Sequence, residues 1–239
     1  MLHASCREIQ PTEHRFPFCS VGATENAILA AAACKGRTVL KNCAVEPEVK
    51  NLCLFLKKMG VKIQGTGTDC LVIEGGSQLK DTEFTIPSDR IAAGTYLFAG
   101  AITRGRVTLH RAPVEELTSI LQVYEKMGGQ YYRNSGKLVT DSRRIRYPVP
   151  YLETEAYPGF PTDMQSVLMS VLATVKGDSV IREQIFEERF KIVSPLNRMG
   201  ARILVDGRDA LIHGTSALKG QHVFAEELRG GAALVLAGL

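Results

Sequence analysis

The chain has 239 residues, of which 45% are hydrophobic and only 10 are prolines, so it can bury one large core or two smaller ones. A formal net charge of +4 fits an anionic small ligand and is far from the basic surface of a nucleic-acid-binding protein. No apolar run approaches the roughly 20 residues of a membrane helix, and the first residues lack the apolar segment of a signal peptide, so we expect a cytoplasmic protein that does not bind a membrane.

The first predicted elements are a helix over residues 23–33 (ATENAILAAAA) and a β-branched strand over residues 36–40 (GRTVL). Alanines dominate the helix. Small side chains let backbones approach closely, so we expect this helix in a crowded centre. Cys19 and Ser20 stand directly before it, where a helix start lowers the pKa of a thiol, although a structural thiol is the simpler interpretation of Cys19.

The next elements are an amphipathic helix and a hairpin. The helix is predicted over residues 46–60 (EPEVKNLCLFLKKMG), with Gly60 as its stop. Two short strands follow, in residues 61–67 and 69–76, joined by a glycine-rich turn. One face of the helix is apolar and is formed by Val49, Leu52, Leu56 and Met59.

All six cysteines lie in the first third of the chain, and none forms a CxxC pair. Two of them sit among apolar residues at helical spacing. This pattern predicts reduced, mostly structural thiols and argues against a disulfide scaffold or a zinc site, and we expect neither a metal nor a cofactor. The cysteines are Cys6, Cys19, Cys34, Cys43, Cys53 and Cys70.

The same order of elements then repeats. The glycine-led strand recurs as GRVTL at 105–109 and GDSVI at 177–181, at separations of 69 and 72 residues. A Met-Gly pair at 59–60 recurs at 127–128 and 199–200, at separations of 68 and 72 residues. Two independent landmarks thus give one period.

Each repeat also contains a small-residue helix, predicted at 92–102 and 164–174 in the second and third. Adding a strand that leads into each unit, such as residues 82–88 (TEFTIPS) before the second, gives the order βαβαββ. The sequence therefore predicts an α/β protein of about three βαβαββ units and the opening of a fourth. Because the chain stops at Leu239 inside a predicted helix, we expect an incomplete piece of a longer protein.

Polar residues stand before each small-residue helix, in Ser20–Thr24, Pro87–Arg90, Pro161–Asp163 and Glu226–Arg229. Capping explains Asp89 and Asp163 most simply, because Ser, Thr and Asp are preferred N-caps and an acid in the first turn suits the helix dipole. A functional role stays open for both. Arg229 opposes the dipole, so an anion cradle at this helix start is as good an explanation for it as a structural one.

Two further features have simple structural interpretations. Residues 186–190 (FEERF) place charges between aromatics, which is typical of a solvated cluster or a local ion pair. His213 alternates with apolar residues on a predicted strand and lacks a local acid partner, which favours packing over function.

Several strings, in order along the chain, closely resemble one family, UDP-N-acetylglucosamine 1-carboxyvinyltransferase, which opens bacterial peptidoglycan synthesis. The pair SVGATEN and GFPTDMQ is specific to it. The sister family that acts on shikimate 3-phosphate shares the repeat but not these strings. The strings are SVGATEN (20–26), EPE (46–48), GTGTD (65–69), DRIAAGTY (89–96), YPGFPTDMQ (157–165), IFEERF (185–190) and LRGGAALVLAGL (228–239).

The resemblance implies two similar domains, each of three βαβαββ units with helices inside and sheets outside, and an active site in the cleft between them. Residues 1–82 would be the last unit of one domain, and residues 83–239 most of the other. The second domain would comprise units 83–148 and 149–216 and a truncated unit 217–239.

The resemblance also implies a reaction. The 3-hydroxyl of UDP-N-acetylglucosamine adds to C2 of phosphoenolpyruvate, and phosphate then leaves a tetrahedral intermediate, which requires a base, an acid and cations for the anionic groups. Asp163 matches the base and Arg229 an arginine that binds phosphoenolpyruvate. The remaining matches are substrate contacts: Ser20, Val21 and Gly22 in the uridine diphosphate segment, Ile185 through its backbone, and Asp89 and Glu187 as acids in the cleft.

The chain also departs from the family. The family's catalytic cysteine, its proton donor, lies N-terminal to the matched segments. The family's N-terminal Lys-Asn pair that meets phosphoenolpyruvate and two further cleft arginines are also absent. Phe18 stands where a lysine often contacts the nucleotide, Glu188 where asparagine is common, and residues 229–231 read RGG instead of RAS. We therefore expect this piece to be inactive without the missing part of its chain. The alternatives are a non-catalytic UDP-sugar-binding paralogue and a transferase acting on shikimate 3-phosphate.

Overall fold

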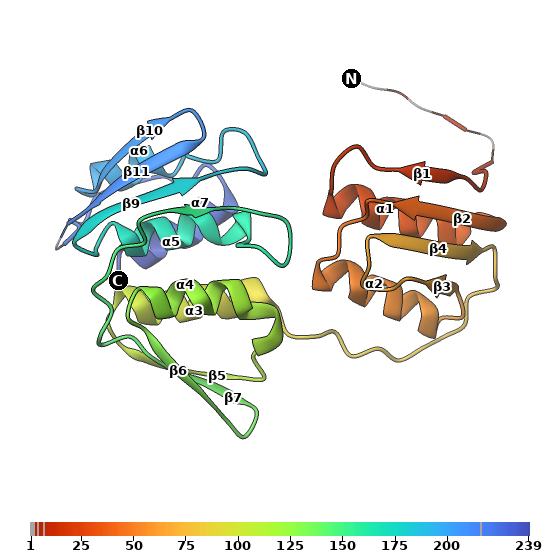
Figure 1. The fold of residues 1–239 in the computed structure, drawn as a ribbon, viewed down its shortest axis with the longest axis horizontal. Coiled ribbons are helices and arrows are strands. Elements are labelled where there is room, and N and C mark those ends of the chain that lie inside the picture. The colour runs from red at the N-terminus through yellow and green to blue at the C-terminus, as the bar shows by residue number, and fades with distance from the viewer. Residues whose placement is uncertain (1–2, 4, 7, 216) are drawn as a thin grey trace. The chain divides into compact units, whose positions relative to one another are not determined.

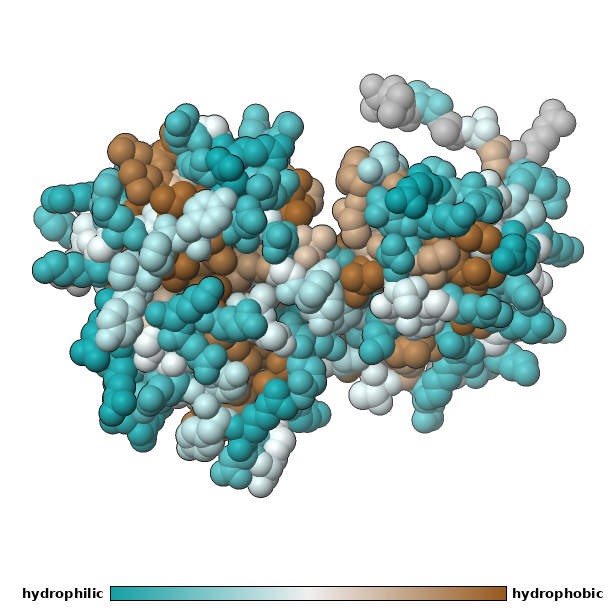
Figure 2. All heavy atoms as spheres, in the orientation of Figure 1, coloured by the Kyte–Doolittle hydropathy of each residue, from teal (hydrophilic) through white to brown (hydrophobic). Residues whose placement is uncertain are grey.

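The computed structural model describes residues 3, 5–6, 8–215 and 217–239. The chain separates into two compact units, the first ending at Pro87 and the second beginning at Ser88. Each unit has its own hydrophobic core. The unit boundary predicted at residue 216 lies outside the described residues. On the face drawn in Figure 2, hydrophilic side chains cover much of the surface of each unit.

The first unit has the predicted order βαβαββ (Figure 1). Its sheet has the strand order β1-β2-β4-β3, in which β1 runs parallel to β2 and the other pairs are antiparallel. The elements are β1 (Glu13–Arg15), α1 (Val21–Ala33), β2 (Gly36–Lys41), α2 (Pro47–Lys58), β3 (Lys62–Gln64) and β4 (Cys70–Gly75).

The amphipathic helix α2 lies as its sequence predicts. Pro47 stands at its first turn, where a missing N–H costs no hydrogen bond. Val49 and Leu56 are buried, and Leu52 and Met59 pack partly buried against the same core. Gly60 follows the helix at φ 106°, a left-handed conformation that glycine adopts without a steric penalty.

The second unit contains two further repeats and the helix α7. Its first repeat comprises α3 (Arg90–Ile102), β5 (Arg106–His110), η1 (Val114–Leu117), α4 (Thr118–Lys126), β6 (Gln130–Asn134) and β7 (Lys137–Asp141). Its second repeat comprises β8 (Leu152–Glu153), η2 (Thr162–Met164), α5 (Gln165–Leu172), β9 (Gly177–Arg182), α6 (Val193–Arg198), β10 (Arg202–Asp206) and β11 (Asp209–Gly214), and α7 spans Leu228–Ala237. The sheets have the orders β5-β7-β6 and β10-β11-β9-β8, and β8 runs parallel to β9.

The strand predicted over residues 82–88 is wrong, because none of these residues is in a strand. The β5-β7-β6 sheet accordingly has three strands, whereas each of the other two sheets has four, including a parallel leading strand. The alternating β-branched residues of TEFTIPS favour an extended backbone, but a strand also needs a hydrogen-bonded neighbour. Pro87 in addition has no N–H to donate.

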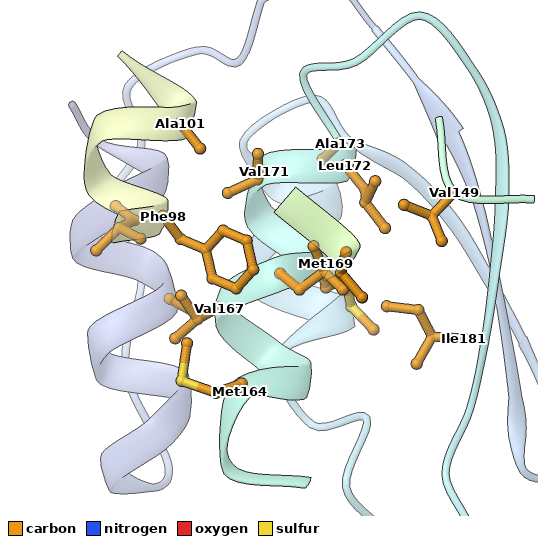
Figure 3. Close-up of a cluster of buried hydrophobic side chains, with 14 of the residues drawn as sticks. Phe98, Ala101, Val149, Met164, Val167, Met169, Val171, Leu172, Ala173 and Ile181 are labelled. Atoms are coloured by element: carbon orange, nitrogen blue, oxygen red, sulfur yellow. The ribbon is translucent and has the colours of Figure 1, made fainter. Parts of the chain in front are cut away.

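Small residues do bring α3, α5 and α7 together, as predicted, but the prediction of a crowded centre is wrong for α1, of which only Thr24, Ile28, Ala31 and Ala32 are buried. All eight residues of α5 are buried. A Cβ on Gly94 of α3 would come within 3.0 Å of Met164 Cε, and Ser170 Oγ of α5 donates to the carbonyl of Ala233 in α7 at 2.9 Å. Figure 3 shows Phe98 pointing toward Val167 and Val171, with Val149 and Ile181 on the opposite side of α5. Full burial stabilises each such side chain by roughly 1.5–3 kcal/mol, so this core fixes the helix starts where the candidate site residues lie.

Candidate active site

Asp163 lies in the short η2 turn that leads into α5. It is not a helix cap: neither η2 nor α5 has a side-chain cap hydrogen bond, so the capping interpretation is wrong for this residue. Because the chain enters α5 through a 3₁₀ turn, the carboxylate is free to turn elsewhere. It accepts a hydrogen bond from Arg229 Nε, and Arg189 Nη1 lies 3.8 Å from the same oxygen. The Asp163 side chain keeps 32% of its surface exposed, so it is held on two sides and open on another.

Arg229 is the second residue of α7 and is held by Asp163. The acid that suits the start of this helix is Glu227, whose Oε1 accepts a hydrogen bond from the Gly230 N–H at 2.9 Å. The unfavourable position of Arg229 relative to the dipole is therefore offset by a carboxylate partner. About a third of its side chain is exposed, which leaves N–H groups available to an anion.

Arg189 completes this cluster, and the sequence did not single it out. It comes from the FEERF segment, whose two glutamates are exposed, and Glu188 forms a local ion pair with Lys191, as predicted. Arg189 instead contacts Asp163, 26 residues earlier in the chain. The Arg189 guanidinium lies 4.3 Å from the centroid of the Phe186 ring, and the Arg189 side chain is only 12% exposed. Its buried Nη1 has no hydrogen-bond partner among the described residues. The aromatics on either side of Arg189 were the only signal that could have indicated a fixed guanidinium.

The cluster thus holds the Asp163 carboxylate from the turn before α5, the Arg229 guanidinium from the start of α7 and the Arg189 guanidinium from the loop between β9 and α6. The guanidiniums of Arg189 and Arg229 beside this carboxylate carry N–H groups that an anion can accept from. The planar forks of arginine suit carboxylate and phosphate oxygens. The carboxylate is in turn a hydrogen-bond acceptor that can take a proton from a hydroxyl brought beside it.

Ile185 and Glu187 lie in the same loop as Arg189 but face other partners. The Ile185 N–H donates to Glu183 Oε1 at 2.9 Å, so this backbone donor is already engaged. Glu187 is 87% exposed, and its Oε1 lies 3.9 Å from Arg208 Nη2. The contacts found for these residues in the described part of the chain do not join them to Asp163.

Asp89 is the N-cap of α3, which confirms the capping interpretation for this residue. Its Oδ1 accepts hydrogen bonds from the Ile91 N–H at 2.7 Å and the Ala92 N–H at 3.1 Å. Both donors belong to its own helix, so the structure gives Asp89 a local role.

Ser20, Val21 and Gly22 form the start of α1 in the first unit. Ser20 is the N-cap, and its Oγ accepts a hydrogen bond from the Ala23 N–H at 3.4 Å. Thr24 Oγ1 donates to the Ser20 carbonyl at 2.7 Å and accepts from the Ala44 N–H at 3.0 Å, which ties this helix start to the next loop. A Cβ on Gly22 would meet nothing within 4 Å, so the surface beside the helix start is open.

Cys19 and His213 differ from two of the interpretations drawn from the sequence. Partial burial raises the pKa of the Cys19 thiol, which argues against a thiol activated by the helix start, and the Cys19 Sγ lies 3.5 Å from the Cys43 carbonyl. All six cysteines are free.

His213 does have an acid partner, Asp178, whose Oδ1 lies 2.7 Å from His213 Nδ1. Antiparallel register pairs the two residues across β9 and β11, which spacing along the chain could not reveal.

Within the part of the chain that the structure describes, no group of three or more His, Cys, Asp or Glu side chains could hold a metal ion. No helix there has both the length and the apolar character needed to cross a bilayer.

A protein-family model described as EPSP synthase (3-phosphoshikimate 1-carboxyvinyltransferase) matches residues 2–239. The curated UDP-N-acetylglucosamine 1-carboxyvinyltransferase 2 of Caldanaerobacter subterraneus subsp. tengcongensis is 46% identical over 220 residues, covering 92% of this chain and 53% of the relative. UDP-N-acetylglucosamine 1-carboxyvinyltransferase 1 of Staphylococcus aureus (strain N315) is 42% identical over 240 residues, covering 100% of this chain and 56% of the relative. This chain therefore spans a little over half the length of these relatives.

The solved structure of the enolpyruvyl transferase NikO from Streptomyces tendae matches with a TM-score of 0.83 at 24% identity, covering 98% of this chain and 58% of that protein. EPSP synthase from Acinetobacter baumannii matches with a TM-score of 0.69 at 17% identity, covering 97% of this chain and 56% of that protein. The repeated architecture is thus the enolpyruvyl transferase fold, as predicted. The chain belongs to the family described as EPSP synthase (3-phosphoshikimate 1-carboxyvinyltransferase), a family of transferases.

Proposed function

We propose that the protein to which this chain belongs transfers the enolpyruvyl group of phosphoenolpyruvate to the 3-hydroxyl of UDP-N-acetylglucosamine and releases phosphate, as a cytoplasmic step of peptidoglycan synthesis. The observation that carries the proposal is the Asp163 carboxylate held between Arg229 and Arg189. The 46% identity to a relative named for this reaction supports the choice of acceptor.

Asp163 acts as the base in this proposal. The sugar hydroxyl gives its proton to the carboxylate while its oxygen bonds to C2 of phosphoenolpyruvate, and C3 gains a proton from an acid. Loss of phosphate from C2 and of a proton from C3 then yields the enolpyruvyl ether. Arg229 and Arg189 bind the anionic groups of phosphoenolpyruvate, because preorganised guanidiniums stabilise charge that shifts during the addition.

Nucleotide recognition belongs to the first unit in this proposal. Ser20, Val21 and Gly22 contact the uridine diphosphate, and the open surface beside Gly22 leaves room for a ligand at a helix start. Ile185, Glu187 and Asp89 contribute further substrate contacts from the second unit. Residues 1–82 are the last βαβαββ unit of one enolpyruvyl transferase domain, and residues 83–239 are most of the other. The family's proton donor supplies the acid for C3 in this proposal.

The test is phosphate release from phosphoenolpyruvate with UDP-N-acetylglucosamine as acceptor, measured on the product of the complete reading frame and on the 239-residue chain. We expect turnover by the former and none by the latter, since the chain lacks the family's proton donor. Turnover with shikimate 3-phosphate instead would assign the other acceptor named in the family description. Tight calorimetric binding of the UDP-sugar without turnover by the complete product would favour a non-catalytic binding protein.

A further inference from the structure

Glu183 is a buried carboxylate directly beyond the end of β9, with 1% of its surface exposed. Three donors satisfy it. Thr162 Oγ1 donates to Oε2 at 2.9 Å, and the N–H groups of Ile185 and Phe186 donate to Oε1 at 2.9 Å and 3.1 Å. Burying a charged group is unfavourable unless it is hydrogen-bonded, and this carboxylate is bonded at both oxygens.

The donors come from the two segments that carry the candidate site. Thr162 directly precedes Asp163 in the η2 turn. Ile185 and Phe186 open the loop that ends in Arg189, and the Phe186 ring lies under the Arg189 guanidinium. One side chain therefore joins the turn that bears the carboxylate of the site to the loop that bears one of its guanidiniums.

Neighbouring bonds fix Glu183 itself. Arg208 Nη1 donates to the carbonyls of Glu183 and Gln184 at 3.3 Å and 3.0 Å, and the Arg208 carbonyl accepts from the Glu183 N–H at 2.8 Å. The Gln184 N–H donates to Thr154 Oγ1 at 2.9 Å. The backbone that places the carboxylate is thus held on both sides.

Stability of the fold alone does not explain why the Glu183 carboxylate is buried. Well-packed apolar residues often stabilise a core as well as a buried charged group does. What an apolar residue cannot do is bind a hydroxyl and two amides in fixed directions. The arrangement is suited to orientation, because small displacements of reacting groups lower rates strongly.

We propose that Glu183 is a positioning residue that sets the Asp163 carboxylate and the Arg189 guanidinium in their relative places through Thr162 and the Ile185–Phe186 amides. The inference rests on the proposed function, in which Asp163 and Arg189 meet the substrates. Glu183 itself touches neither substrate.

The experiment uses Thr162→Val, which removes one donor at constant shape, and Glu183→Gln, which places an NH₂ group against the Thr162 hydroxyl. In the complete enzyme we expect each to lower kcat by about 10- to 100-fold, the range that follows from misplacing a catalytic group by up to about 1 Å. We expect the KM of UDP-N-acetylglucosamine to change less than threefold. Thr162→Ser should restore at least half of the rate. Because both substitutions change the same hydrogen bond between Thr162 and Glu183, the double variant should lose little more than either single variant.

Ser179→Ala is the matched control. Ser179 is buried in β9, and its Oγ accepts from the Val149 N–H at 3.0 Å, so the variant also loses a buried side-chain bond but away from the site. We expect a comparable loss of thermal stability and an unchanged kcat. Retention of kcat within twofold by both Thr162→Val and Glu183→Gln would overturn the proposal.

A second readout separates this inference from the proposed function. In the complete protein, the side-chain Nε–H resonances of Arg189 and Arg229 report on the geometry around Asp163 by NMR. We expect both to shift in Thr162→Val and Glu183→Gln and to stay in place in Ser179→Ala. Shifted resonances together with an inactive wild-type protein would contradict the proposed function but support the positioning role of Glu183. Unshifted resonances would contradict the positioning role whatever the activity.

Discussion

Asp163 and Arg229 are 66 residues apart in the chain and share a hydrogen bond between a carboxylate oxygen and a guanidinium Nε. The first stands at the start of α5 and the second at the start of α7, two helices that pack against each other through Ser170 and the Ala233 carbonyl. The pairing orients the carboxylate and at the same time holds a cation beside it. In the proposed reaction, this pairing would place the base beside a group that binds phosphoenolpyruvate, as addition to its C2 requires.

Asp163→Asn keeps the shape of the side chain and removes its negative charge. We expect the kcat of the complete enzyme to fall by about 10²- to 10⁴-fold, because a positioned base is worth roughly that factor. The KM of phosphoenolpyruvate should not rise, since Arg229 and Arg189 lose a competing carboxylate. Steady-state kinetics measure both. Asp178→Asn, at the exposed partner of His213, is the control that should leave both constants unchanged. A loss of less than threefold in kcat would remove Asp163 from the role of base.

Arg189→Lys keeps a positive charge but loses the planar fork and its stacking on Phe186. We expect the KM of phosphoenolpyruvate to rise by about tenfold or more, because a hydrogen bond to a charged group contributes roughly 1.5–3 kcal/mol. The KM of the UDP-sugar should change little. Arg198→Lys serves as control, since Arg198 is an exposed arginine that bonds the His222 carbonyl at 2.8 Å. Equal changes in both KM values would point to a general disturbance instead of a lost anion contact.

The sequence predicts structure best where the conformation of a residue depends on residues close to it along the chain. Repeated glycines, small-residue helices and the apolar face of α2 follow from local spacing, and the fold follows from their repetition. Arg189 and the partner of His213 were missed because each pairs across a distance that no local pattern encodes. Local spacing favoured a cap for Asp163 and left a functional role open for the same reason: its residue type fits a helix start, but its partner lies on another helix. The strand over residues 82–88 failed because strand formation depends on a neighbour, not only on propensity.

Asp89 allows capping and function to be separated. Asp89→Ala should destabilise the second unit by about 1 kcal/mol, the usual cost of a lost N-cap, whereas Asp89→Ser should restore most of that stability because serine also caps. If Asp89 also contacts substrate, Ser will restore the unfolding temperature but not kcat/KM. Thermal unfolding and kinetics on the same variants make the comparison. If Asp89→Ser recovers both the unfolding temperature and kcat/KM, capping is the only role of Asp89.

Gly22→Ala tests the nucleotide site of the first unit. A methyl group here meets no protein atom within 4 Å, and alanine favours helix over glycine by up to about 1 kcal/mol, so the variant should fold at least as stably as the wild type. If uridine diphosphate approaches this helix start, the methyl should weaken binding of the UDP-sugar to the complete enzyme by several-fold. Calorimetry gives the affinity and thermal unfolding the stability. Ala33 ends the same helix and is exposed, so Ala33→Ser is a control at its far end. Unchanged affinity in Gly22→Ala would place the nucleotide elsewhere.

Glu188 occupies a backbone conformation that suits asparagine better than glutamate. Its φ is 55°, in the left-handed region where asparagine is enriched and glutamate is disfavoured. Its only identified charge partner among the described residues is Lys191, whose Nζ lies 3.8 Å from Glu188 Oε2 between two mostly exposed side chains, a pair that contributes little. We therefore expect Glu188→Asn to stabilise the second unit by up to about 1 kcal/mol, or about 2–4 °C in unfolding temperature. Glu188→Gln removes the charge but keeps a side chain without that preference, so it should be close to neutral. An equal gain from Gln would assign the effect to charge and contradict the backbone explanation.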